Sequence, residues 1–116
     1  MDKIQIVDLD VACRVGVPEE ERSKPQRLLI SIEMAVDFSD AARQDDLTKT
    51  IDYSAVSRRV FQFVEGRNWK LIEKLSVDLA EIILLEFKPE EVTIEIKKFV
   101  IPEARYVSVQ ISRAKI

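Results

Sequence analysis

Four segments of the chain alternate apolar and polar residues, which is the pattern of a β-strand that buries one face. The most regular of them covers residues 28–38, and its apolar face carries Leu28, Ile30, Ile32, Met34, Val36 and Phe38. The segments 4–17, 92–99 and 106–112 show the same period. The first of these loses its phase near residues 8–10, where we predict a β-bulge. The pattern therefore predicts four strands.

Two segments in the middle of the chain have apolar residues at helical spacing. The first helix is expected to begin after the N-cap Asp52 and to end at Gly66, and its apolar positions are Val56, Val60, Phe63 and Val64. Asn68 is a plausible cap for the second helix, expected over residues 69–87. That helix is apolar on most sides, so we expect it to pack against a partner subunit as well as its own sheet.

The elements follow one another as strand, strand, helix, helix, strand, strand (ββααββ). Because no helix separates the two strands of either pair, both pairs are predicted to be antiparallel hairpins. The fold class is therefore α+β, with two helices on one face of an antiparallel four-stranded sheet. A charged connection over residues 19–25 joins the first two strands. No linker or repeat interrupts the chain, so residues 1–116 are predicted to form a single domain.

Composition excludes several classes of function. The net charge of -3 and the pI near 5.1 disfavour nucleic acid as a partner, since phosphate binding needs clustered Lys and Arg. The chain has no histidine, which excludes Ser-His-Asp and Cys-His mechanisms and His-rich zinc sites, and we expect no metal site. Cys13 is the one cysteine, and its apolar neighbours predict a small buried side chain. With neither a signal-peptide pattern nor a membrane-length apolar run, a cytoplasmic location is expected.

Lys98 breaks the pattern of its strand. Val92, Ile94 and Ile96 share one face, and the next residue on that face is Lys98. A buried ammonium needs an acidic partner or a function. The alternative is that the strand ends here and that the lysine reaches water.

Two further residues stand out, and both have an ordinary structural explanation. Glu73 heads an apolar stripe of the second helix, although an exposed glutamate at a helix start accounts for the same spacing. Tyr53 follows the predicted cap of the first helix, where a tyrosine commonly anchors the helix to the core. The acidic run at residues 19–21 is most often a solvated face.

Several separated motifs occur together in one order, and they are Gly16-Val17-Pro18-Glu19-Glu20-Glu21-Arg22, Pro25-Gln26, Asp45-Asp46-Leu47, Thr50-Ile51-Asp52-Tyr53, Leu71-Ile72-Glu73-Lys74-Leu75 and Lys98. With this set the chain resembles the dihydroneopterin aldolase family over nearly all of its length. The resemblance implies the tunnelling fold, in which subunits join their sheets into a ring. It also implies a homo-oligomer, either a tetramer ring or an octamer of two stacked rings, with active sites between subunits.

The resemblance also implies how a pterin is held. Glu73 corresponds to the carboxylate that accepts two parallel hydrogen bonds from the 2-amino group and the adjacent ring nitrogen. Backbone groups of Leu71 and Ile72 would add contacts to the ring. Ile51 and Asp52 would line the wall and the edge of the pocket.

For catalysis the resemblance implies three residues. Lys98 corresponds to the catalytic lysine, Tyr53 to a tyrosine contributed by a neighbouring subunit, and Glu21 to an acid near the lysine. The implied activity is that of a lyase of folate biosynthesis, which splits 7,8-dihydroneopterin into 6-hydroxymethyl-7,8-dihydropterin and glycolaldehyde. Because the pterin ring accepts the electrons of the broken bond, the reaction is expected to need no metal and no cofactor.

Two departures from the family pattern leave alternatives open. The chain has Arg14-Val15-Gly16 where many aldolases have Tyr-His-Gly, and its loop over residues 99–106 is short and lacks glycine. Both features resemble the dihydroneopterin triphosphate 2'-epimerases, in which case Arg105 would meet a phosphate. A third alternative is a catalytically degenerate pterin-binding protein. The sequence leaves open whether the substrate is phosphorylated and which side-chain stereochemistry is preferred.

Overall fold

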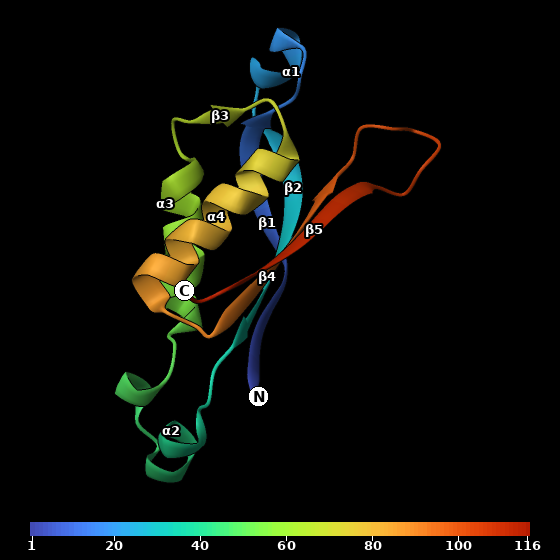
Figure 1. Cartoon of the computed structure of the whole chain (residues 1–116). Helices are drawn as coiled ribbons and strands as arrows, with labels where there is room; N and C mark the ends of the chain where they lie inside the picture. Colours follow the sequence, from blue (N-terminus) through green and yellow to red (C-terminus); the bar gives the residue numbers. More distant parts are fainter.

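The computed structural model describes residues 1–116 as a curled sheet with its two long helices on one side (Figure 1). The sheet has five strands in the order β3-β1-β2-β4-β5. The strands are β1 Lys3–Val15, β2 Gln26–Ala35, β3 Asn68–Trp69, β4 Glu91–Lys98 and β5 Val107–Ala114. The helices are α1 Glu19–Arg22, α2 Ser39–Gln44, the 3-10 turn η1 Leu47–Lys49, α3 Tyr53–Val64 and α4 Ile72–Phe87.

The four long strands pair antiparallel, β1 with β2, β2 with β4 and β4 with β5. The alternation predicted for the second strand is confirmed up to Met34, because Leu28, Ile30, Ile32 and Met34 are all buried. The strand ends at Ala35, however, and Phe38 is the N-cap of α2 instead of a strand residue. The predicted bulge in β1 is also confirmed. The register of β1 against β2 shifts between Ile6 and Leu9, and Asp8 has a φ of 56°.

The prediction of four antiparallel strands is wrong at residues 68–69. Asn68 and Trp69 pair parallel with Arg14 and Val15, so the sheet is mixed and has a fifth strand. Asn68 therefore does not cap the second helix, which begins at Ile72 with Leu71 at its N-cap. The physical reason is a long-range contact, since the amide of Gly16 donates to the Trp69 carbonyl at 3.0 Å. The charged connection after β1 also contains a short helix, α1, so the ββααββ order omits this helix, α2, η1 and β3.

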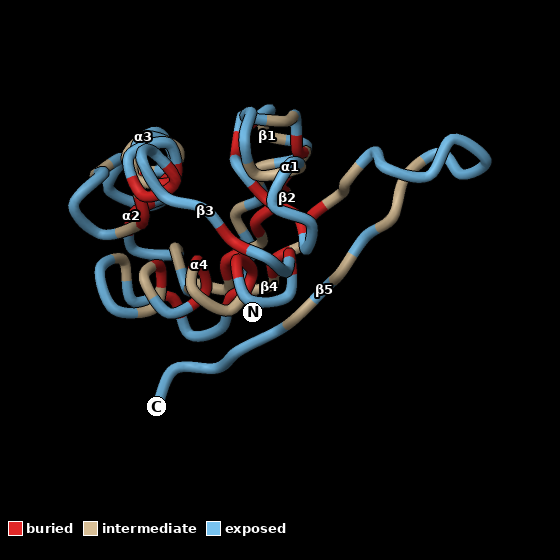
Figure 2. Tube along the Cα trace, turned by 90° about the horizontal axis from the view of Figure 1, so that it is seen from above, coloured by how far each residue is buried: buried red, intermediate tan, exposed pale blue.

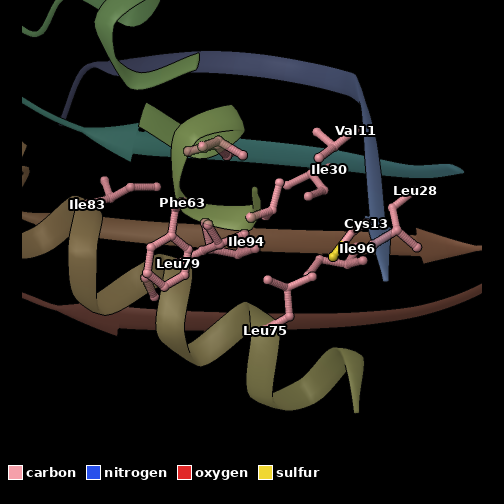
Figure 3. Packing of buried hydrophobic residues seen from close by; sticks show 14 of the residues in the cluster. Val11, Cys13, Leu28, Ile30, Phe63, Leu75, Leu79, Ile83, Ile94 and Ile96 are labelled. Carbon is pink, nitrogen blue, oxygen red and sulfur yellow. The ribbon is translucent and has the colours of Figure 1, made fainter. Parts of the chain in front are cut away.

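The core lies between the sheet and the two long helices (Figure 3). It comprises 21 buried residues, to which α3 contributes Val56, Val60, Phe63 and Val64, as their helical spacing predicted. Helix α4 faces the sheet with Leu75, Leu79 and Ile83. Its other side stays open in a single chain, and Leu85 is 73% exposed. Within one chain, α4 is thus buried on one face only.

The loop that connects β4 and β5 extends away from the rest of the molecule (Figure 2). This loop, over residues 99–106, begins with three exposed apolar side chains, Phe99, Val100 and Ile101. No helix in the chain has the length and hydropathy of a membrane span.

Candidate active site

Lys98 is the last residue of β4, and its side chain is only 12% exposed. Its amine lies 3.5 Å from a carboxylate oxygen of Glu21, which belongs to α1. The strand does end at Lys98, but the lysine turns inward to an acidic partner instead of reaching water. The neighbouring Lys97 lies on the other face of the sheet, where its amine pairs with Asp8 at 3.0 Å.

Lys98 lines a cavity of about 260 Å³. The cavity is lined by Val17, Glu21, Lys70, Leu71, Ile72, Glu73, Lys98, Val100, Val107 and Val109. Five residues that the sequence singled out therefore meet at one place, although they come from α1, the start of α4 and the end of β4. The cavity wall is mostly apolar, and its charged groups are two carboxylates and two amines.

The start of α4 is a ready site for hydrogen bonding. The first amide groups of a helix have no partner within the helix. No side chain caps α4, and its N-cap Leu71 is 47% exposed with extended backbone angles. Glu73 lies in the first turn and is exposed. Backbone donors and a carboxylate acceptor therefore stand side by side at the cavity, a combination that suits a planar ring with both kinds of group on one edge.

The other three candidate residues do not reach this cavity within one chain. Asp52 caps α3, as predicted, by accepting from the amides of Ser54 at 3.0 Å and Ala55 at 3.3 Å. Ile51 is buried beside it, and Tyr53 is 61% exposed. All three lie at the start of α3, next to α2, whereas α1 and the start of α4 lie at the opposite end of the molecule (Figure 1).

Trp69 and Asp78 hold the segment that leads into the cavity. The indole N–H donates to the Asp78 carboxylate at 2.9 Å, and Lys74 donates to it at 2.8 Å. Burial, the largest single influence, acts to raise the pKa of Asp78, but the two hydrogen bonds together with the positive charges of Lys74 and Arg67 outweigh it, so the pKa is lowered. The carboxylate therefore stays charged and ties β3 to the second turn of α4.

Cys13 is not part of the site. It is 2% exposed within the core, and burial raises the pKa of its thiol to about 11. This confirms the prediction of a small buried side chain and excludes a thiolate nucleophile at neutral pH. Nowhere in the chain do three Cys, Asp or Glu side chains cluster in a way that would hold a metal ion.

Sequence reasoning missed the apolar wall of the cavity and Lys70. Val107 and Val109 alternate correctly for a strand, but their place beside the cavity depends on the register that sets Lys98 opposite Val107. Lys70 lies between β3 and α4, in a segment predicted to be helical. The period-two pattern of the last strand was the one feature of the sequence that could have pointed to the apolar wall of the cavity.

Comparisons with known proteins agree on one family. Residues 4–112 match the family model described as FolB: Dihydroneopterin aldolase. The dihydroneopterin aldolase of Haemophilus influenzae is 31% identical over 114 residues, which cover 97% of each chain. That of Escherichia coli strain K12 is 34% identical over 98 residues, or 84% of this chain and 80% of that protein. The crystal structure of E. coli dihydroneopterin aldolase in complex with neopterin matches with a TM-score of 0.94 at 32% identity, covering 98% of this chain and 100% of that chain.

Proposed function

The chain belongs to the dihydroneopterin aldolase family, and on that basis we propose that it cleaves 7,8-dihydroneopterin. The products are 6-hydroxymethyl-7,8-dihydropterin and glycolaldehyde, which makes the protein a lyase of folate biosynthesis. The observation that carries this proposal is the cavity in which Lys98 pairs with Glu21 at 3.5 Å while Glu73 stands at the uncapped start of α4.

In this proposal the start of α4 binds the pterin ring. The carboxylate of Glu73 accepts hydrogen bonds from the 2-amino group and the adjacent ring N–H, and a carboxylate receives such a pair well. The backbone at Leu71 and Ile72 offers unpaired amides to the ring oxygen, because α4 has no side-chain cap. The side chain of the substrate then extends toward Lys98 and Glu21.

The reaction needs movement of protons rather than a cofactor. Removal of the proton from the 2'-hydroxyl lets the bond between C1' and C2' break, which releases C2' and C3' as glycolaldehyde. The electron pair of that bond moves into the ring imine and leaves an enol-like C1', which then takes up a proton. Lys98 and Tyr53 shuttle these protons in the proposal, and Glu21 holds the amine of Lys98 in place. Activity is accordingly expected to survive treatment with EDTA.

We infer that Tyr53, Asp52 and Ile51 join the site from a neighbouring subunit of a ring-shaped homo-oligomer. The inference is supported by the separation of the start of α3 from the cavity and by the exposed apolar side chain of Leu85 on α4. A tetramer ring or an octamer of two rings would satisfy both observations. Sedimentation equilibrium separates these states from a monomer.

A second candidate function, dihydroneopterin triphosphate 2'-epimerase, is favoured by the loop after Lys98. That loop is short, lacks glycine and carries the exposed Arg105, whose guanidinium lies 5.9 Å from the centre of the Tyr106 ring. Epimerisation starts with the same bond cleavage and differs in that the released fragment, glycolaldehyde triphosphate, rejoins C1' through the opposite face of its aldehyde. The product therefore distinguishes the two functions, since the residues of the cavity serve both.

Two substitutions test the division of roles between Lys98 and Glu73. Lys98→Ala is expected to lower kcat by about 100-fold or more while pterin binding persists, because general acid-base groups contribute roughly this much. Glu73→Ala is expected to abolish measurable binding by calorimetry. Lys115→Ala, at an exposed pair with Glu90 far from the cavity, is the matched control and should behave as wild type. Tight pterin binding without turnover in the wild type would instead identify a degenerate binding protein.

A further inference from the structure

The turn that carries Glu21 is held closed by two arginines, neither of which lines the cavity. Arg22 donates from its Nη1 to the carbonyls of Gly16 and Val17, at 2.8 Å each. From the other side, Arg14 at the end of β1 donates to the carbonyl of Arg22 at 3.1 Å and to that of Ser23. The start of the turn is thus bonded to a guanidinium near its end, and the end of the turn is bonded to a guanidinium just before its start.

The helix in this turn has little else to hold it. Helix α1 has four residues, buries none of them and has no side-chain cap. A single helical turn is not stable by itself in water. Its place on the protein therefore depends on side-chain bonds to the neighbouring backbone, of which Arg22 provides two.

Gly16 is the point on which this turn closes. Its amide is bonded to the carbonyl of Trp69, and its carbonyl accepts from Arg22. Its φ of +151° favours glycine, and a Cβ at this position would overlap both the Cβ and the carboxylate of Glu21. Glu21 is therefore packed directly against the backbone that Arg22 holds.

We propose that Arg22 is a positioning residue that keeps the carboxylate of Glu21 opposite the amine of Lys98, with Arg14 bracing the same turn. The proposal rests on the proposed aldolase function for its effect on turnover. Arg22 acts through Glu21, since its guanidinium is engaged by two carbonyls and lies outside the cavity lining. The pterin-binding start of α4 does not touch Arg22, so the effect falls on the chemical step and not on affinity.

Steady-state kinetics of Arg22→Met tests this role. We expect kcat to fall about tenfold while KM stays within about twofold, because displacing a catalytic group by a fraction of an ångström to 1 Å costs rate of this order. Arg22→Lys retains a donor and should recover part of the loss. Arg43→Met, on exposed α2 and paired only with Asp40, is the matched control and should leave kcat unchanged.

A double-mutant cycle separates positioning from a general structural effect. If Arg22 acts through Glu21, Arg22→Met should add no further loss of kcat in the Glu21→Gln background. Equal losses in both backgrounds, or an unchanged kcat in Arg22→Met, would overturn the proposal. If Arg22→Met does not fold, Arg22→Lys and Arg14→Met complete the same cycle with the same criterion.

Acylation of Lys98 gives a measure that does not depend on a pterin. Acetic anhydride reacts with exposed, unpaired amines, and mass spectrometry follows the rate at Lys98 alone. Opening the turn in Arg22→Met should raise that rate toward the rate in Glu21→Gln, while Arg43→Met keeps the wild-type rate. An unchanged rate contradicts the proposal. If Arg22→Met raises the acylation rate of Lys98 but the wild type shows no aldolase turnover, the positioning role of Arg22 is supported and the proposed function is refuted.

Discussion

Two variants that are each inactive are predicted to restore activity when their subunits are mixed. The pair is Lys98→Ala and Tyr53→Phe. In one chain these two residues lie far apart. Helix α3 begins at Tyr53, and its other end leads to β3, where the Trp69 carbonyl accepts from the amide of Gly16 near the turn that carries Glu21 (Figure 1). The 12 residues of α3 span about 18 Å at 1.5 Å each, and Tyr53 is not among the residues that line the cavity of its own chain, so we expect it to act in the cavity of a neighbouring subunit.

The size of the recovery follows from how the site is shared. A complete site takes Lys98 from a Tyr53→Phe subunit and Tyr53 from a neighbouring Lys98→Ala subunit. In an equal mixture each condition holds for half of the subunits, so about one quarter of the sites are complete in a randomly assembled symmetric ring. The specific activity should therefore reach about one quarter of the wild-type value and decline on either side of equal mixing.

The assay is co-refolding of the two variants over a range of ratios, followed by the rate of glycolaldehyde release. The matched control is a mixture of Lys98→Ala with Glu73→Ala. Both of these residues line the cavity of one chain, so every site in the mixture lacks one of them and no activity should return. Recovery in the control, or its absence in the first mixture, would refute a site that is shared between subunits.

Three further predictions concern stability. Leu75→Ala, in the centre of the core, should lower the free energy of unfolding in urea by about 2–5 kcal/mol, because it leaves a cavity between α4 and the sheet. Asp78→Asn should cost about 1–3 kcal/mol at neutral pH by weakening the bonds to Trp69 and Lys74. The pKa of Asp78 is lowered from 3.8 in the folded protein. The difference in unfolding free energy between the wild type and Asp78→Asn should therefore vanish in urea titrations as the pH falls below 3.8. Cys13 should not react with a thiol reagent at pH 8 until the protein is unfolded. Because burial raises the pKa of this thiol from 9.0 to about 11, the wild type should also lose stability relative to Cys13→Ala as the pH rises through this interval.

The parts of the fold that depend on local pattern were predictable. The alternation of Leu28, Ile30 and Ile32 requires only that one face of a strand be buried, and the lost phase near Asp8 marked the bulge. Lys98 was visible as an exception for the same reason, because a charge in an aliphatic row conflicts with its local pattern. The identity of its partner was not visible, since Glu21 reaches it across 77 positions of sequence through the pairing of β1, β2 and β4.

The predictions that failed concern features that depend on contacts between distant segments. Asn68 has the right side chain for a helix cap, yet its neighbour Trp69 is drawn into the sheet by the amide of Gly16 and by the carboxylate of Asp78. No local propensity reports such a pairing. The contacts of Arg22 with the Gly16 carbonyl and of Arg14 with the Arg22 carbonyl are hidden for the same reason, because both arginines look like ordinary surface charges in the sequence.

The most direct test of the proposed function is the identity of the product. Purified wild-type protein given 7,8-dihydroneopterin should release glycolaldehyde and 6-hydroxymethyl-7,8-dihydropterin in equal amounts, as chromatography and a carbonyl reagent would show. If the protein leaves this substrate intact and converts only the triphosphate to its 2' epimer, the account of an aldolase is contradicted.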